Sequence, residues 1–392
     1  MIEAYEKEVV MLKRFRPMQY LFMLFLATIF AGNVFAANVK QKIVVFAPGF
    51  SNPVQQAALL RNLGVVPVKP LRIVNGFAVS LPDAAFDALQ NDNQNILRID
   101  DDIVLHGTAK PVDPLPQPPQ ELTWGVDRIE ADLAWSETNG TMINVAVLDT
   151  GADLDHPDLT DNIKGNFSAL NPHKSAEDDN GHGTHVSGII AAANNTIGII
   201  GAAPQINLYV VKVLGSDNTG NLSDILDGMQ WCIDNHMQVV NMSFGATSTV
   251  QSLADAVEAM HAAGIVQVAA AGNNGTSGGA MLYPARYPET IAVSSVDVNG
   301  NLAVTSSYGP EVDLAAPGVS IYSTYLDAGY IYKNGTSMAT PHVTASAALV
   351  LSVFPALTPD EVKTKLKSSA EDLGLPADEQ GAGLVRPDIA IH

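Results

Sequence analysis

Residues 334–342 have the sequence NGTSMATPH, in which one serine stands between a glycine and an apolar segment. The apolar residues continue to Val353, and this pattern predicts a buried helix over 337–353 with Ser337 in its first turn. A serine hydroxyl is a weak nucleophile unless a neighbouring imidazole accepts its proton, and that imidazole needs a carboxylate to orient it. A histidine and an aspartate in similar glycine-rich segments would complete a nucleophilic site.

Two segments earlier in the chain supply these residues. Asp149 ends the apolar segment of AVLDTG at 146–151, and open α/β sheets place their sites at such strand ends. His182 stands between glycines in NGHGTHVSG at 180–188, at a predicted helix start. The glycines allow a substrate backbone to come close. The three segments together predict a catalytic triad of Asp149, His182 and Ser337.

Other kinds of active site fit less well. Aspartic proteases also contain Asp-Thr-Gly, but they need two such aspartates and this chain has one. His182 and His185 suggest a metal pair, yet the sequence has no His-Glu-x-x-His motif. The single cysteine, Cys232, lies in an apolar helical pattern that favours an inert packed thiol over a nucleophile.

From about residue 120 to the end, apolar strand patterns alternate with helical patterns. Strands are predicted at 143–148, 208–213, 239–243, 265–271 and 291–296, and helices at 182–193, 222–235, 253–263 and 337–353. Buried strands separated by helices predict an α/β fold with a parallel sheet covered on both faces.

A smaller α+β pattern precedes this region. Strands are predicted at 43–46, 65–68, 77–81 and 96–104, with helices at 55–63 and 83–90. A unit of fewer than ~70 residues has a marginal core and is expected to lean on a neighbour. Residues 109–119 then form a proline-rich linker, which is expected to be extended and unpaired.

The beginning of the chain has the pattern of a secretory signal peptide over 1–36. Lys13, Arg14 and Arg16 precede an apolar run at 20–30, and small residues follow before Ala36. The acidic residues before Met11 do not suit a signal, so Met11 is expected to be the true start. The run is shorter than the ~20 residues that span a bilayer. Secretion, extracellular or periplasmic, is therefore expected without a permanent membrane span, and an uncleaved anchor is the alternative.

The composition limits the partners. A net charge of −20 argues against nucleic acid, because phosphate binding needs clustered lysine and arginine. Charged residues make up only 16% of the chain, which indicates folded protein rather than disorder. Acidity by itself decides little else about the function.

From about residue 40 onward the chain resembles the precursors of subtilisin-like serine proteases, the subtilase family, through the three segments around Asp149, His182 and Ser337. The resemblance implies a three-layer α/β fold with a mostly parallel sheet over 120–392. It also implies a small α+β propeptide domain over 37–108. The activity it implies is that of a monomeric serine endopeptidase that acts on protein or peptide substrates, forms an acyl-enzyme and uses no catalytic cofactor.

The resemblance assigns further residues to the cleft. Asn273, in the segment AAAGN, matches the side chain that completes an oxyanion hole. The expected substrate-binding residues are Asn218, Thr219, Gly220, Ser243, Phe244, Gly245, Ala270, Ala271, Gly272 and Leu282. Leu282 stands where the family tends to have glycine at the pocket floor, so a shallower pocket is expected.

A structural calcium site is also implied. The expected ligands are Gln120, Asp158, Ala193, Asn195, Ile197 and Ile199. Side-chain and carbonyl oxygens suit a hard cation with many oxygen ligands. The alternative is a plain asparagine-rich turn.

The N-terminal unit resembles an inhibitor-like propeptide, and the segment RIDDDIVLHGT at 98–108 resembles the tail that enters the cleft as a product. Its implied roles are those of intramolecular chaperone and inhibitor, removed by a self-processing cut after Thr108.

Three rival functions remain. A catalytically silent homologue would have lost a residue of the triad or the oxyanion hole, and none is lost here. An esterase of the α/β-hydrolase type would need Gly-x-Ser-x-Gly and the order Ser, Asp, His. A membrane-tethered processing protease would share the chemistry and differ only in retaining the signal segment.

Overall fold

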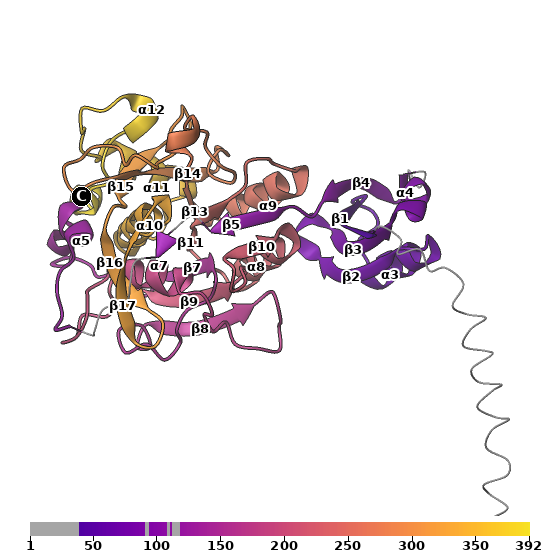
Figure 1. Cartoon of the computed structure of the whole chain (residues 1–392), viewed down its shortest axis with the longest axis horizontal. Helices are drawn as coiled ribbons and strands as arrows, with labels where there is room; N and C mark the ends of the chain where they lie inside the picture. The colour runs from indigo at the N-terminus through magenta and orange to yellow at the C-terminus, as the bar shows by residue number, and fades with distance from the viewer. Residues whose placement is uncertain (1–38, 91–93, 108–109, 112–117) are drawn as a thin grey trace, which may run out of the picture.

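The structure is a computed structural model that describes residues 39–90, 94–107, 110–111 and 118–392. It consists of a large α/β body and a smaller N-terminal unit that packs against one side of it (Figure 1). The predicted signal peptide and the cut after Thr108 lie outside the described residues. Within the described ranges, no helix combines the length and apolar character needed to cross a bilayer.

The large body is built on a seven-stranded sheet in which every pairing is parallel. The strand order is β15-β14-β13-β11-β7-β9-β8. The strands are β7 (Asn144–Asp149), β8 (Ile163–Ser168), β9 (Asn207–Lys212), β11 (Val239–Met242), β13 (Val266–Ala270), β14 (Thr290–Val296) and β15 (Leu314–Pro317). The central strands are buried and apolar, as expected of a parallel sheet covered on both faces.

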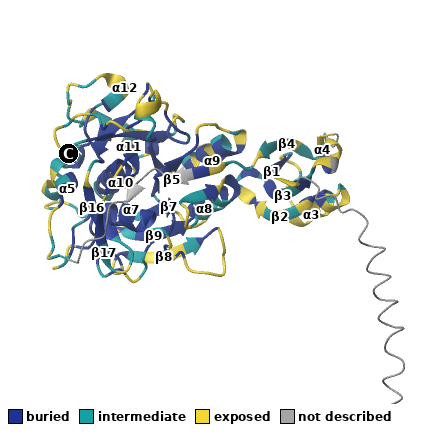
Figure 2. Ribbon diagram, in the orientation of Figure 1, coloured by how far each residue is buried: buried dark blue, intermediate teal, exposed yellow. Residues whose placement is uncertain are grey.

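Helices cover both faces of this sheet. On one face lie α7 (His182–Ala191) and α10 (Thr336–Val353), and on the other lie α8 (Leu222–Asp234) and α9 (Gln251–Ala262). Each face has its own apolar core. Figure 2 shows the buried residues concentrated in the interior of the large body. The predicted three-layer α/β fold is therefore confirmed, and these four helices begin and end within two residues of their predicted limits.

Several elements were not predicted. Strand β8 alternates buried and exposed residues at the sheet edge, and β15 is short and ends in proline. An antiparallel hairpin, β16 (Ile321–Tyr325) and β17 (Gly329–Asn334), packs on α7. The remaining helices are α5 (Trp124–Arg128), α6 (Ala131–Ala134), α11 (Pro359–Ser368), α12 (Ala377–Gln380) and α13 (Pro387–Ala390).

The N-terminal unit is an antiparallel sheet of order β2-β3-β1-β4 with two helices. Its elements are β1 (Val39–Phe46), α3 (Pro53–Asn62), β2 (Val66–Leu71), β3 (Gly76–Pro82), α4 (Asp83–Gln90) and β4 (Ile96–Asp101). One face of β1 and β3 packs on the unit's own helices, while Ile43, Val45 and Ala78 join the core beneath α8 and α9. The unit thus leans on its neighbour, as its small size predicted.

Two sequence expectations for residues 96–119 were wrong. The last strand does not run to Val104, because β4 ends at Asp101 and β5 (Val104–Gly107) joins a different sheet. The linker is not wholly unpaired, because β6 (Lys110–Pro111) pairs with β17. A proline on an edge strand loses only its N–H donor and can still accept through its carbonyl.

Candidate active site

The predicted aspartate and histidine meet at the carboxyl end of the sheet. Asp149 is the last residue of β7 and His182 is the first of α7. His182 Nδ1 and Asp149 Oδ1 are 2.6 Å apart, and both side chains are buried. Asp149 Oδ1 also accepts a hydrogen bond of 2.7 Å from the Thr150 N–H. A carboxylate at Nδ1 places the ring proton there, so Nε2, which has no hydrogen-bond partner among the described residues, can accept a proton.

A glycine is required for this approach. A Cβ on Gly183 would lie 2.1 Å from the Gly151 carbonyl oxygen and 3.0 Å from Asp149 Cβ. Any larger residue would therefore separate α7 from β7 at the site.

The loop before His182 is held by Asp178. Its carboxylate accepts hydrogen bonds from the backbone N–H groups of Asn180, Gly181 and Thr184, and from the Thr184 hydroxyl. Burial by itself would raise the pKa of Asp178, but these hydrogen bonds outweigh it and hold the pKa below its ordinary value. Asp178 is thus an anion that fixes the start of α7, a role that sequence reasoning missed.

Ser337 lies in the first turn of α10, which packs against α7. Its hydroxyl donates a 2.9 Å hydrogen bond to the Ser243 carbonyl, and the Ser243 hydroxyl donates one of 3.0 Å to the Ser337 carbonyl. Asn241 donates to the Ser243 hydroxyl and accepts from Thr344. A buried polar chain therefore fixes the backbone of Ser337. In this structure the Ser337 hydroxyl is bonded to Ser243 and not to His182.

Asn273 follows β13 and contacts the residue before Ser337. Its Oδ1 accepts hydrogen bonds from the Thr336 N–H (3.0 Å) and the Thr336 hydroxyl (3.3 Å). Because the carbonyl of the amide is held by Thr336, its NH₂ group is directed to the opposite side. The orientation suits a donor to an oxyanion formed beside Ser337.

The expected substrate-binding segments form the two sides of a slot. Strand β5 lies between β10 (Thr219–Asn221) and β12 (Phe244–Gly245) as the middle strand of an antiparallel sheet. On the β10 side, Gly220 pairs with Leu105 of β5. On the β12 side, Phe244 pairs with Gly107 and Gly245 pairs with His106. The tail of the N-terminal unit thus occupies this slot as an added strand.

Leu282 lies between two of the predicted pocket walls. A Cβ on Gly245 would lie 2.7 Å from Leu282 Cβ, and one on Gly272 would lie 2.7 Å from Leu282 Cγ. The Leu282 N–H also donates to the Ala271 carbonyl at 2.8 Å. The leucine side chain therefore fills space that glycine would leave open.

The residues predicted to bind calcium also come together. Gln120 Nε2 lies 3.0 Å from the Ala193 carbonyl oxygen and 3.5 Å from both Asn195 Oδ1 and the Ile199 carbonyl oxygen. Asp158 accepts from Asn195 Nδ2 at 2.7 Å, and burial raises its pKa. The Ala193 and Ile199 carbonyl oxygens and Asn195 Oδ1 thus surround the Gln120 amide, and the Asp158 carboxylate is hydrogen-bonded to Asn195. Oxygen donors of these kinds fit calcium. The described residues contain no metal-binding group of three His, Cys, Asp or Glu side chains.

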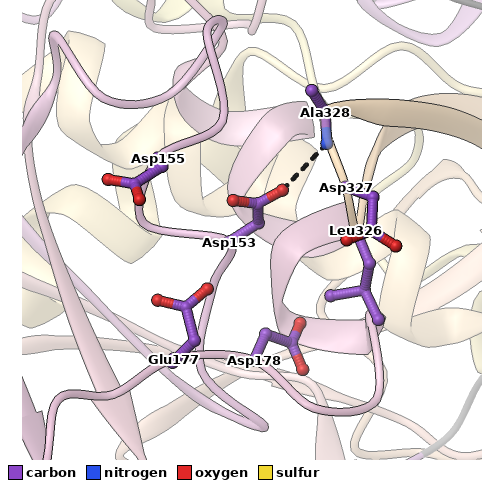
Figure 3. A pocket seen from close by; sticks show the side chains of 7 residues that line it. All are labelled: Asp153, Asp155, Glu177, Asp178, Leu326, Asp327 and Ala328. Carbon is purple, nitrogen blue, oxygen red and sulfur yellow. Dashed lines mark hydrogen bonds between the residues drawn. The ribbon is translucent and has the colours of Figure 1, made fainter.

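An acidic pocket of about 290 Å³ lies beside the Asp178 loop. It is lined by Asp153, Asp155, Glu177, Asp178, Leu326, Asp327 and Ala328 (Figure 3). The side chain of Asp153 accepts a hydrogen bond of 3.0 Å from the Ala328 N–H at the tip of the β16–β17 hairpin. The pocket lies between the loop after β7, the loop before α7 and the turn of this hairpin, and it was not predicted from the sequence.

A parallel α/β fold that places an aspartate, a histidine and a serine in neighbouring segments has the arrangement of a serine hydrolase. A family model described as the subtilase family matches residues 140–384. The chain therefore belongs to the subtilase family and is a serine endopeptidase.

Individual relatives agree with this assignment. Subtilisin BL of Lederbergia lenta is 44% identical over 274 residues, which cover 70% of this chain and 100% of that protein. The thermostable alkaline protease of Halalkalibacterium halodurans is 45% identical over 274 residues, covering 70% of this chain and 74% of that one. Subtilisin amylosacchariticus of Bacillus subtilis subsp. amylosacchariticus is 42% identical over 331 residues, covering 83% and 82%. The last alignment is longer than the peptidase region and so includes part of the N-terminal unit.

Proposed function

We propose that the chain is the precursor of a secreted endopeptidase that cuts its own propeptide and then cleaves extended segments of other proteins. The observation that carries the proposal is the position of β5, the middle strand between β10 and β12. A chain in this slot leads toward the helix that begins with Thr336 and Ser337. Secretion is proposed from the signal-like sequence at 1–36.

In the proposed mechanism, Ser337 Oγ attacks the peptide carbonyl carbon and its proton passes to His182 Nε2. Asp149 keeps the Nδ1 proton in place and stabilises the imidazolium. The Asn273 amide and the Ser337 N–H donate to the oxyanion. His182 then protonates the leaving amine, and water hydrolyses the acyl-enzyme by the same path. No catalytic cofactor takes part.

The N-terminal unit is proposed to act as chaperone and inhibitor. Support comes from its contacts with the first turns of two helices: Asp102 accepts from the Ser223 N–H of α8 at 2.9 Å, and Asp100 accepts from Ser252 of α9. Carboxylates at helix N-termini stabilise helices. Lys69 forms an ion pair of 2.5 Å with Asp224 of α8. The proposed cut after Thr108 would release this unit.

Calcium is proposed to stabilise the mature enzyme through Gln120, Asp158, Asn195 and the carbonyls of residues 193, 197 and 199. We expect EDTA to shorten the half-life of thermal inactivation, because a ligand that binds only the folded state stabilises it. Calcium should restore the half-life, and Asp158→Asn, which removes the single carboxylate, should make the enzyme insensitive to EDTA. An unchanged half-life of the wild type in EDTA would refute the calcium site.

The proposed activity is tested with succinylated tetrapeptide anilides that carry alanine or phenylalanine before the scissile bond. The wild type should hydrolyse them, favour alanine because Leu282 narrows the pocket, and lose activity with phenylmethylsulfonyl fluoride. Leu282→Gly should raise kcat/KM for the phenylalanine substrate about tenfold or more, with the alanine substrate as internal control. A processed, folded wild type that is inert on both substrates and on casein would favour a peptide-binding or narrow processing role.

A further inference from the structure

A buried lysine connects the β16–β17 hairpin to the loop before His182. Lys333, on β17, is only 2% exposed, and its Nζ donates a 3.2 Å hydrogen bond to the Gly181 carbonyl. Gly181 is the residue immediately before His182. The ammonium group also lies 5.2 Å from the centre of the Tyr325 ring on β16. A lysine is buried only where charge and hydrogen bonds offset its desolvation, so its position calls for a role.

The same hairpin holds the loop at a second point. The Tyr325 hydroxyl donates to the Asn180 carbonyl at 3.3 Å. Gly181 has φ +91°, and a Cβ there would lie 2.1 Å from Tyr325 Cε2. The carbonyls of both residues that precede His182 are therefore bound by side chains of one hairpin.

Strand β17 has a second neighbour on its other side. Lys333 faces Pro111 and Asn334 faces Lys110 in an antiparallel pairing with β6. Lys110 and Pro111 follow the proposed cut after Thr108 in the sequence, so β17 pairs with the chain beyond that bond.

We propose that Lys333 is a positioning residue, which fixes the loop of His182 to the strand that receives the chain beyond the scissile bond. The inference rests on the proposed triad. Lys333 touches no reacting atom and acts through Gly181. Lys333 links β17 to the Gly181 carbonyl, next to His182. A substrate that lies along β17 would therefore lie against the same strand that holds the imidazole in position.

The charges around Lys333 add an electrostatic effect. Its charge interacts favourably with Asp178 before α7 and with Asp149 at the end of β7, and unfavourably with a protonated His185 on α7. Burial lowers the pKa of Lys333 to about 8, although the two carboxylates act in the opposite direction. Burial, with a contribution from Lys333, also holds the pKa of His185 well below its usual value. Lys333 is thus a cation at neutral pH whose charge interacts with the carboxylate that binds His182.

The test is Lys333→Met, which keeps an unbranched side chain, one atom shorter, and removes its charge and donor. We expect kcat on an anilide at pH 7 to fall about tenfold, because a small displacement of a reacting group is costly. KM should stay unchanged. Removing a cation near Asp149 favours the imidazolium, so the acid limb of kcat/KM should move to higher pH by about half a unit. A purely structural role would leave this limb in place.

Lys363→Met is the matched control. Lys363 of α11 also donates to backbone carbonyls, those of Pro288 and Thr290, at the far end of the body. This variant should keep the wild-type kcat and acid limb. If Lys333→Met folds and shows wild-type values for both, the inference is overturned.

A second measurement on the wild type covers the case in which Lys333→Met does not fold. The low-field proton resonance of the Asp149–His182 hydrogen bond should shift as the pH is raised through the range in which Lys333 loses its charge. The absence of any shift there would also overturn the inference. If Ser337→Ala keeps activity, the proposed function itself fails. If Ser337→Ala is inert while Lys333→Met behaves as the wild type, only the role of Lys333 fails.

Discussion

Replacing Ser337 with alanine should lower kcat about 10⁶-fold, the magnitude found for the nucleophile of subtilisin itself. The neighbouring hydroxyl, that of Thr336, is already engaged, because it donates to Asn273 Oδ1 and accepts from the Gly272 N–H. Because the proposed cut after Thr108 uses the same serine, the variant should also remain at precursor size. Mass spectrometry of the secreted protein and hydrolysis of a tetrapeptide anilide measure both effects.

Ser346→Ala is the matched control for this prediction. Ser346 is a buried serine of the same helix, and its hydroxyl donates to the His342 carbonyl at 2.8 Å. This variant should be processed and active. A Ser337→Ala protein that matures as fast as the wild type, when expressed alone, would contradict self-processing.

Replacing Asn273 with leucine should lower kcat about 10²- to 10³-fold while KM changes little, as was found for the oxyanion asparagine of subtilisin. The donor is needed only when the carbonyl oxygen acquires negative charge. Thr336 holds the amide carbonyl in place, so the NH₂ group is already oriented before substrate binds. Steady-state kinetics on one anilide separate the two constants.

The neighbouring residue provides the control. The Asn274 side chain donates to the Ala280 carbonyl at 3.0 Å, so Asn274→Leu should affect stability more than kcat. If Asn273→Leu raised KM and left kcat unchanged, Asn273 would bind the ground state and the oxyanion role would be wrong.

The sequence predicted most of the fold because the central elements are uniform in character. Strands β7, β11 and β13 are mainly apolar, and α10 is a mainly buried helix of 18 residues that begins directly after Gly335. Strand β8 was missed because Lys164 and Asn166 interrupt its apolar pattern at the edge of the sheet. One continuous strand was wrongly predicted across Asp101 and Val104, because a strand pattern does not show which sheet a strand joins.

The part of the site that could be predicted is the part whose chemistry requires a particular residue type at each position, such as an aspartate beside a histidine. Asp149 and His182 were expected to meet, and their hydrogen bond is present. The roles of the triad, the cleft residues and the calcium ligands stay predictions. Asp178 and Lys333 were not foreseen, because a buried charge in the sequence looks like any surface charge until its partners are known.

The middle position of β5 has a consequence for what the mature enzyme can attack. When β5 leaves, β10 and β12 face each other across a gap one strand wide, about 10 Å for a strand spacing of ~4.8 Å. A helix with its side chains is about 10–12 Å across, and a hairpin brings two strands, so neither fits. A folded protein would be cut only where a segment opens locally. Its susceptibility would then follow the free energy of that opening, with about a tenfold slower cut for each ~1.4 kcal/mol.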